Sequence, residues 1–327
     1  MDSPTIPTTM RAAVYRPGNQ NLVLDGAYPV PQPKTNQVLL RVAACGACHS
    51  DTFLLSNAFI DDRSYVFGHE TVGYAVQCGE DVKDIEEGRL YAVYAIRPCA
   101  ARTGTFPPIE DSTGIGQDGG FAEYVLVDER QLVPVPPGLK PEIAAVASDS
   151  LITAYNAVYN VAGLRPWTKK RVLIYGVGGV GHQALQLAKH YGATVFAVDF
   201  KPAARELALK VGAERALTLS ELSREAEAGQ FTVDVVNRLP FSLAMAATKN
   251  NAFEFTKPPS KIVLVGVSAE LLPLISADVI EYNIQVPGVV KPLIERAPLE
   301  DVDQALNDLR ASAVLGRRII LPTLHRA

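Results

Sequence analysis

A glycine-rich segment, GVGGVG at residues 176–181, constrains the fold of this chain more than any other stretch. It directly follows an apolar run at residues 171–175 and precedes a stretch with helical periodicity. A turn of this spacing between a buried strand and a helix is typical of a dinucleotide-binding βαβ unit. Glycine turns also occur in α/β sheets that bind no nucleotide, so the context of the segment decides between the two interpretations.

Each glycine has a physical role in a nucleotide loop. Gly176 permits the tight turn, Gly178 lets the backbone approach a pyrophosphate, and Gly181 allows close packing of helix on strand. The start of the helix adds unpaired N–H groups and a partial positive charge for the phosphates. We therefore expect cofactor binding by the loop residues Gly176, Gly178, Gly179, Val180 and Gly181.

An acidic residue, Asp199, ends the next predicted strand, 21 residues after Gly178. A carboxylate at this place can accept hydrogen bonds from both ribose hydroxyls and would repel a 2′-phosphate. The sequence therefore favours NAD(H) over NADP(H). Lys201 lies nearby in the sequence and weakens the preference for NAD(H), because its positive charge would attract the 2′-phosphate of NADP(H).

The pattern of predicted secondary structure changes near residue 150. The earlier part contains short strand-like runs, such as 38–42 and 122–127, separated by proline-rich turns, which predicts a β-rich, barrel-like unit. After a helix-compatible stretch at 144–161, strands and helices alternate, which predicts a parallel, doubly wound sheet. The predicted strands are 171–175, 194–199, 232–236 and 261–266, with helices at 182–191, 203–211 and 299–309 and a closing strand at 317–321.

Composition excludes several classes of function. The formal net charge is −4 and no basic run occurs, which argues against nucleic acid or an anionic membrane as a partner. No uncharged apolar run reaches the ~20 residues that span a bilayer, and residues 1–11 do not form a secretory signal. The four cysteines are too few for a disulfide framework. We expect a cytoplasmic protein with a small-molecule substrate.

Two short stretches, CGACHSD at 45–51 and GHE at 68–70, bring metal-ligand side chains together in sequence. Cys48 and His69 are ligands that zinc prefers. Cys45 and Cys48 could instead be buried thiols or half of a zinc ribbon, and His69 could be a core histidine. No second CxxC completes a ribbon. Together with the nucleotide loop, the two stretches indicate a Lewis-acid metal that acts beside a hydride carrier.

Five motifs in a fixed order resemble a known family. CGACHSD, GHE, STGIGQDGGFAEYV at 112–125, YGVGGVG and KIVLVG are similar to the zinc-dependent alcohol dehydrogenases of the medium-chain dehydrogenase/reductase superfamily. The resemblance implies an α/β plus β fold. Residues 1–150, completed by 290–327, would form a GroES-like β-barrel catalytic domain, and residues 151–289 a Rossmann coenzyme domain. It also implies a homodimer or homotetramer.

The resemblance implies roles for residues near the two metal stretches. Cys48 and His69 would be zinc ligands, and Glu70 would lie beside the metal and approach it when the water ligand changes. Asp51 would hold a ligand in place, with His69 as its natural partner.

The resemblance also implies which residues transfer the proton and bind the coenzyme. Ser50 resembles the hydroxyl that takes the substrate proton, and His49 the basic residue that contacts the coenzyme pyrophosphate. The family's proton relay ends in a histidine at the position that Phe53 occupies here. His49 is then the available group that titrates near neutral pH.

Asp149 stands where many family members have a cysteine as the third zinc ligand. A carboxylate is a legitimate zinc ligand at ~2.0–2.2 Å. The alternative is that Asp149 caps a helix that starts near Ser150, which is a common role for aspartate.

The chain also lacks parts that relatives carry. Of the four closely spaced cysteines of a structural zinc lobe only Cys99 remains, so we predict one catalytic zinc and no structural zinc. The segments between 234 and 261 and after 288 look shortened, which bears on coenzyme affinity and oligomeric state.

The sequence thus predicts a zinc-dependent oxidoreductase that transfers hydride between an alcohol or carbonyl substrate and NAD(H). One alternative is a zinc-independent NAD(P)H-dependent reductase of activated double bonds, although such proteins usually lack the CHSD run. Another is a degenerate homologue that binds nucleotide without turnover. The candidate substrate-pocket residues, each of which could equally belong to the core, are Phe53, Leu54, Phe59, Tyr65 and Tyr94.

Overall fold

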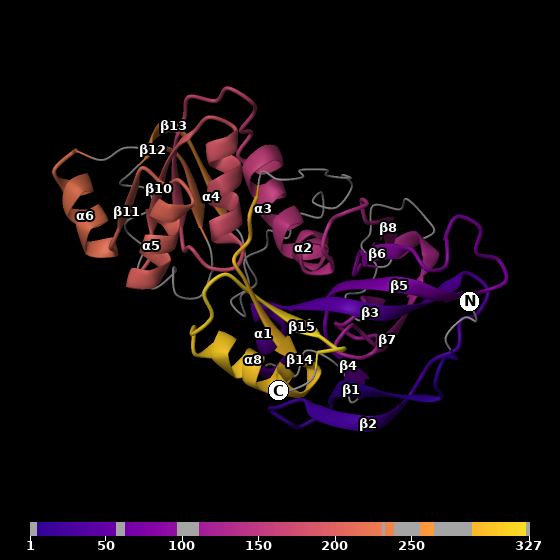
Figure 1. Ribbon diagram of the computed structural model, residues 1–327. Coiled ribbons are helices and arrows are strands. Elements are labelled where there is room, and N and C mark those ends of the chain that lie inside the picture. Colours follow the sequence, from indigo (N-terminus) through magenta and orange to yellow (C-terminus); the bar gives the residue numbers. More distant parts are fainter. Residues whose placement is uncertain are drawn as a thin grey trace. The chain divides into compact units, whose positions relative to one another are not determined.

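The chain folds into two compact units, shown in Figure 1, the first made of Met1–Asp149 with Ile294–Ala327 and the second of Ser150–Leu293. The computed structural model describes residues 5–56, 63–96, 111–230, 233–238, 256–264 and 290–324. Cys99, Phe59 and most of the two shortened segments lie outside these residues.

The first unit is built on two sheets. One has the order β2-β1-β4, and the other has the order β14-β15-β3-β5-β6-β8, with β7 also paired to β3. The strands are β1 Thr9–Tyr15, β2 Val23–Pro29, β3 Gln37–Ala47, β4 Tyr65–Val66, β5 Glu70–Cys78, β6 Leu90–Val93, β7 Tyr124–Asp128, β8 Leu132–Pro134, β14 Ile294–Pro298 and β15 Arg317–Leu321. The predicted strands 38–42 and 122–127 correspond to β3 and β7.

β3 is the central strand of the larger sheet, because it pairs with β5, β7 and β15. Its residues are almost continuously buried, so it lacks the alternation of a strand with one face in water. The core around β3 includes Leu54 and Tyr65, which are 9% and 3% exposed. These two pocket candidates are therefore packing residues.

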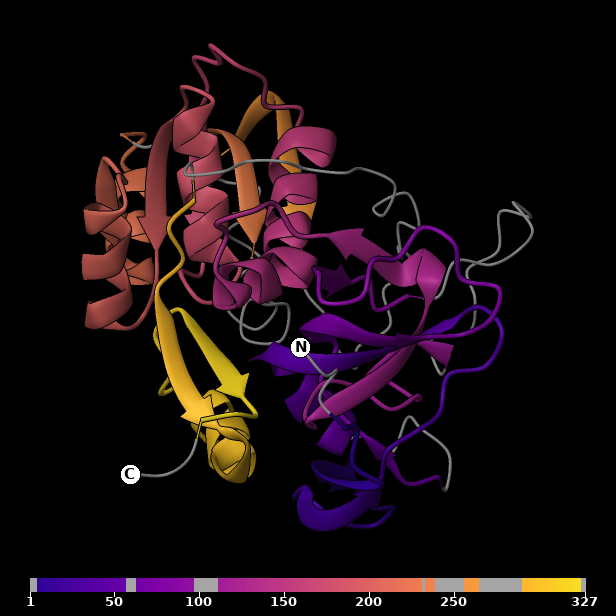
Figure 2. The ribbon, with the colours of Figure 1, turned by 45° about the vertical axis from the view of Figure 1, so that its right-hand side comes forward.

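The last described part of the chain closes the first unit. β15 runs antiparallel to the end of β3, with Ile319 opposite Gly46, and β14 runs parallel to β15. Between them lie η6 Leu299–Asp301 and α8 Val302–Arg310, which Figure 2 shows in yellow at the end of the two strands. α1 His49–Ser56, directly after β3, packs against α8. The closing strand thus borders the CGACHSD motif.

The second unit contains a parallel sheet of order β11-β10-β9-β12-β13. In chain order this is 3-2-1-4-5, the arrangement of a doubly wound dinucleotide-binding sheet. α4 packs on β9 and β10, and α5 on β10 and β11. The elements are β9 Arg171–Tyr175, α4 Gly181–His190, β10 Thr194–Val198, α5 Pro202–Lys210, β11 Arg215–Leu217, α6 Leu219–Glu227, β12 Val233–Arg238 and β13 Thr256–Leu264.

A helical stretch at residues 141–161 leads from the first unit into the second. It consists of α2 Pro141–Val146, the π-helical η3 Ala147–Leu151, α3 Ile152–Tyr155 and the π-helical η4 Asn156–Val161. The division between the units falls within η3, between Asp149 and Ser150. Among all the described helices, none is long and apolar enough to cross a membrane.

Candidate metal centre and nucleotide loop

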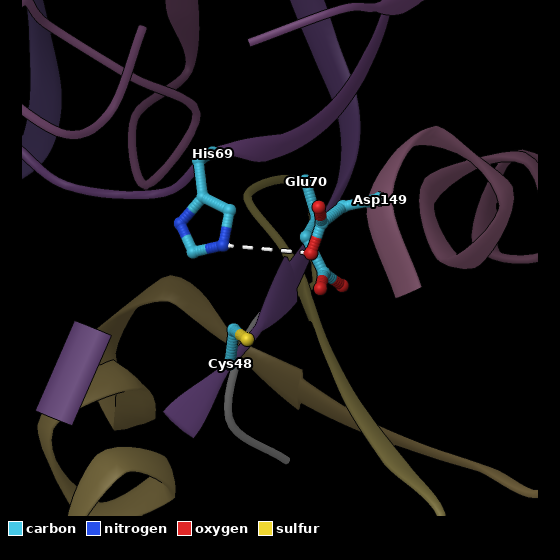
Figure 3. A group of neighbouring side chains, drawn as sticks. All are labelled: Cys48, His69, Glu70 and Asp149. Atoms are coloured by element: carbon cyan, nitrogen blue, oxygen red, sulfur yellow. Dashed lines mark ion pairs between the residues drawn. The ribbon is translucent and has the colours of Figure 1, made fainter. Parts of the chain in front are cut away.

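Four side chains of the first unit converge on one point. Cys48, His69, Glu70 and Asp149 each offer a ligand atom, and these atoms all lie within 4.8 Å of one another. Figure 3 shows the four side chains directed toward one another. A thiolate, an imidazole and carboxylates form a donor set that suits zinc. The structure therefore brings together all of the predicted metal residues.

Two glycines make room for this cluster. β3 and β5 pair so that Gly46 faces Glu70, and a Cβ at Gly46 would lie 2.0 Å from Glu70 Oε2. Gly68 has φ +103°, and a Cβ there would lie 2.7 Å from the main-chain nitrogen of Phe121. Only glycine fits these two positions, which lets the turn before β5 present His69 and Glu70 side by side.

One carboxylate orients two of the candidate ligands. Asp51 is fully buried, and its Oδ1 lies 3.0 Å from His69 Nδ1. Its Oδ2 accepts the N–H of Cys48 at 2.8 Å. A proton on Nδ1 that is held by Asp51 leaves the Nε2 lone pair of His69 facing the cluster. The predicted contact between Asp51 and His69 is confirmed.

The same contact sets the charge of the imidazole. Burial alone lowers the pKa of His69, but the negative charge of Asp51 and hydrogen bonds to Asp51 and Cys48 together raise this pKa well above its ordinary value. A metal that binds Nε2 must displace a proton held there.

Asp149 lies in the π-helical η3, so it does not start a helix. The helical stretch begins eight residues earlier, at Pro141, and the interpretation of Asp149 as a helix cap is wrong. Its Oδ2 lies 3.8 Å from His69 Nε2. Single π turns inside helices often occur at functional sites, because they rotate the following side chains relative to an α-helix.

Arg317, at the start of β15, was not foreseen as a site residue. It is 4% exposed, and its Nη2 donates a hydrogen bond to Glu70 Oε2. The other oxygen of this carboxylate, Oε1, is buried without a hydrogen-bond partner among the described residues. Burial raises the pKa of Glu70, and the guanidinium opposes that rise. The consecutive arginines that open a predicted apolar strand were the available sequence signal.

Cys45 is a structural thiol. It is fully buried, its Sγ lies 3.5 Å from Thr71 Oγ1, and it is not one of the four grouped candidate ligands. Burial raises the pKa of the Cys45 thiol. Of the two cysteines in the CxxC pair, only Cys48 therefore faces the candidate metal centre.

The remaining predicted residues of the first unit surround the cluster. Ser50 Oγ lies 3.6 Å from Cys48 Sγ, and the exposed His49 begins α1. Tyr94 follows β6, and its hydroxyl is buried without a hydrogen-bond partner among the described residues. Burial and the charge of Asp149 raise the pKa of Tyr94. Tyr94 thus remains a candidate pocket residue, unlike the core residues Leu54 and Tyr65.

The nucleotide loop of the second unit has the backbone geometry that its sequence predicts. Gly176 has φ +93°, and its N–H donates to the carbonyl of Val198 at 2.8 Å. A Cβ at Gly178 would meet no atom within 4 Å, so the space beside this residue is open. Val180 precedes α4 without a capping side chain. Within the first turn of α4, the N–H groups of His182 and Gln183 donate to the carbonyls of Gly178 and Val180, each at 3.1 Å.

Two side chains missed in the sequence hold loop carbonyls inward. His182 Nδ1 lies 2.7 Å from the carbonyl oxygen of Gly178, and Gln183 Nε2 donates to the carbonyl of Gly179 at 2.7 Å. Both side chains are fully buried. Carbonyls held in this way do not face an incoming phosphate, which would repel them.

Asp199 follows β10 and is held by the backbone of two neighbouring segments. Its Oδ2 accepts the N–H of Val177 at 2.8 Å, and its Oδ1 accepts the N–H of Lys201 at 2.9 Å. Each carboxylate oxygen keeps a second lone pair. The predicted acidic residue thus lies against the glycine loop, with the backbone of Lys201 beside it.

Two protein-family models match the chain. One is described as alcohol dehydrogenase GroES-like domain and matches residues 34–137, and the other as zinc-binding dehydrogenase and matches residues 179–306. The predicted fold class, a GroES-like β unit with a doubly wound Rossmann sheet, is thereby confirmed.

Individual relatives are similar over nearly the whole chain. An alcohol dehydrogenase of Geobacillus stearothermophilus is 28% identical, covering 89% of this chain and 93% of that protein. The structure of acetophenone reductase from Geotrichum candidum in complex with NAD has a TM-score of 0.76 at 26% identity, covering 97% of this chain and 98% of that one. A zinc-binding dehydrogenase from Sinorhizobium meliloti 1021 bound to NADP has a TM-score of 0.79 at 26% identity, covering 97% and 100%.

Proposed function

The chain belongs to the zinc-dependent alcohol dehydrogenases of the medium-chain dehydrogenase/reductase superfamily, and on this premise we propose that Cys48, His69 and Asp149 hold its catalytic zinc. The family members are oxidoreductases of alcohols and carbonyls, and this chain is one of them. The observation that carries the proposal is the convergence of the ligand atoms within 4.8 Å. Glu70 is the fourth member of this group, and its buried Oε1 has no hydrogen-bond partner among the described residues.

Zinc bound there supplies a Lewis acid that polarises the substrate oxygen and lowers the pKa of an alcohol. The residues of the chain provide the rest. Asp51 fixes the imidazole of His69, and Arg317 holds one oxygen of Glu70 so that the other faces the cluster. Ser50 takes the proton of the substrate hydroxyl, and the exposed His49 passes it to water. A bound nicotinamide would supply the hydride donor or acceptor.

The coenzyme is proposed to be NAD(H) rather than NADP(H). The support is the carboxylate of Asp199, which two backbone N–H groups hold at the end of β10 with lone pairs left for ribose hydroxyls. A 2′-phosphate would meet a like charge at this place. A substitution of Asp199 by serine should raise the ratio of NADPH to NADH turnover, whereas Lys201→Ala should lower it. An unchanged ratio in both variants would contradict this choice.

We further propose one zinc per chain, a homodimer or homotetramer, and a cytoplasmic location. The support for a single zinc is compositional, since only Cys99 remains of a second zinc lobe, whereas the oligomeric state and the location follow from the family resemblance. Metal analysis with light scattering tests the first two parts. Two zinc ions per chain, or a monomer at micromolar concentration, would contradict them.

The function is tested by oxidation of NADH with a panel of carbonyl compounds, among them an aromatic ketone, an aliphatic aldehyde and an enone. Activity with ketone or aldehyde that is lost on chelation and regained with zinc is the expected result. Chelator-resistant reduction of the enone alone would favour the zinc-independent double-bond reductase. Coenzyme binding without turnover of any member would favour the degenerate homologue.

A further inference from the structure

We propose that Gln183 is a positioning residue that ties the phosphate-binding loop to the helical segment that carries Asp149. The inference rests on the proposed function, because it assumes that the loop binds coenzyme and that Asp149 binds metal. Its consequence is that the two ligands influence each other's affinity through one buried amide.

The side chain of Gln183 joins two segments of the chain by donating one hydrogen bond to each. Its Nε2 donates to the carbonyl of Gly179 at 2.7 Å and to Ser150 Oγ at 3.1 Å. Gly179 belongs to the loop, whereas Ser150 belongs to η3. Gln183 and Ser150 are both fully buried, so water does not compete for these hydrogen bonds.

The orientation of the amide follows from its partners. The carbonyl of Gly179 can only accept, so the NH2 group of Gln183 must face it. The Oε1 atom is then left buried without a hydrogen-bond partner among the described residues. A buried acceptor without a partner is unfavourable, and the gain at Nε2 must outweigh that loss. The two hydrogen bonds that Nε2 donates therefore stabilise this orientation of the Gln183 side chain.

Ser150 directly follows Asp149 in the chain, and both lie in the five-residue η3. Neighbouring residues in a helical turn move together, because their peptide planes are fixed by backbone hydrogen bonds. A displacement of Gly179 on phosphate binding is therefore passed by Gln183 to Ser150 and changes the position of the Asp149 carboxylate. The displacement thus passes from the loop carbonyl to the Gln183 amide, then to the Ser150 hydroxyl and finally to the metal ligand Asp149.

Coupling of this kind is reciprocal. If bound coenzyme strengthens metal binding by some factor, bound metal strengthens coenzyme binding by the same factor. We expect a factor of about five or more in the unmodified protein, at the lower end of measured couplings. Removal of either hydrogen bond that the Gln183 amide donates should bring the factor close to one.

The test uses the full chain, with cobalt as a spectroscopic replacement for zinc. NADH affinity is measured by fluorescence titration of the metal-free and the cobalt-loaded protein, and the cobalt absorption bands are recorded with and without NADH. The variants are Gln183→Leu, which removes both bonds, and Ser150→Ala, which leaves the bond to Gly179 intact. Gln186→Leu is the matched control, because Gln186 lies on the same helix and bonds to Lys291 and the carbonyl of His182 instead.

The expected result is a fivefold or larger gain in NADH affinity on cobalt loading, with a shift of the cobalt bands on NADH addition, in the unmodified protein and in Gln186→Leu. Ser150→Ala should bind cobalt and NADH separately but lose both the gain and the shift. Equal coupling in Ser150→Ala and the unmodified protein would overturn the inference, as would an unmodified protein without coupling. Failure to bind cobalt or NADH at all would instead overturn the proposed function. If Gln183→Leu does not fold, Ser150→Ala decides the matter alone.

Discussion

The metal cluster and the nucleotide loop are specified by the sequence in different ways. The cluster draws Cys48, the pair His69 and Glu70, and Asp149 from three distant parts of the chain, with Arg317 from a fourth. The loop is one continuous hexapeptide that follows β9 and ends at the first residue of α4. The first region depends on side-chain donors that the fold must bring together, whereas the second depends on local backbone geometry.

This difference predicts opposite sensitivities. Changes of a donor atom should damage the metal cluster while the fold persists, because each ligand is supported by neighbours such as Asp51. Additions of a Cβ should damage the loop, because its contacts come from N–H groups and open space. Substitutions at four positions test the contrast.

The largest effect is expected for His69→Ala. The activity should fall by about 10³-fold or more in kcat/KM, since Lewis-acid stabilisation is worth several kcal/mol. NADH affinity of the metal-free protein should stay unchanged. His190→Ala is the matched control, because His190 is an exposed histidine at the end of α4. An equal loss of kcat/KM in His69→Ala and His190→Ala would show that the loss does not come from a missing metal ligand.

Asp149 should come next. Asp149→Asn should weaken zinc binding by roughly 100-fold, because it replaces a negatively charged carboxylate by a neutral amide. An amide competes poorly with water as a zinc ligand. Asp149→Cys should bind zinc at least as tightly as the unmodified protein, since thiolate is a preferred zinc ligand. A competition titration with a chromophoric chelator measures both. Equal affinity in all three proteins would remove Asp149 from the ligand set.

Asp51→Asn should reduce zinc affinity by about 10- to 100-fold, the usual cost of losing a carboxylate that orients a metal-bound histidine. The same competition titration applies. The thermal stability of the metal-free protein serves as the control measurement. A fall in stability without any change in zinc affinity would mean that Asp51 supports the fold alone.

The smallest effect is expected for Gly178→Val in the loop. NADH binding should weaken roughly tenfold, about 1.4 kcal/mol, because the side chain fills space that the pyrophosphate needs. Metal affinity and melting temperature should not change, since a Cβ at Gly178 meets no atom within 4 Å. Gly26→Val is the control, because Gly26 also has open space but lies in β2. A comparable loss of NADH binding in Gly26→Val would contradict the role of the loop.

Strands that form distinct apolar runs could be predicted from the sequence. The bounds of β9 and β15 agree with the predicted 171–175 and 317–321, because both strands are short apolar runs flanked by turns or charges. α6 was missed although Thr218 and Glu221 form a capping box at its start. Its helix is mostly polar, so the hydrophobic pattern did not stand out.

The candidate site was predictable where a motif carries it. Cys48, His69 and Glu70 lie in recognisable short runs, and the structure brings them together. Arg317 and Gln183 could not be predicted, because their importance comes from partners far away in the sequence. The alternative role of Asp149 as a helix cap is wrong for a similar reason, since a π turn inside a continuous helix leaves no signal in composition.

The proposed zinc ligands can be identified by X-ray absorption at the zinc edge of the zinc-loaded protein. We expect one sulfur neighbour at ~2.3 Å, from Cys48, with nitrogen and oxygen neighbours at ~2.0–2.2 Å. Two or more sulfur neighbours, or none, would contradict the proposed ligand set of Cys48, His69 and Asp149.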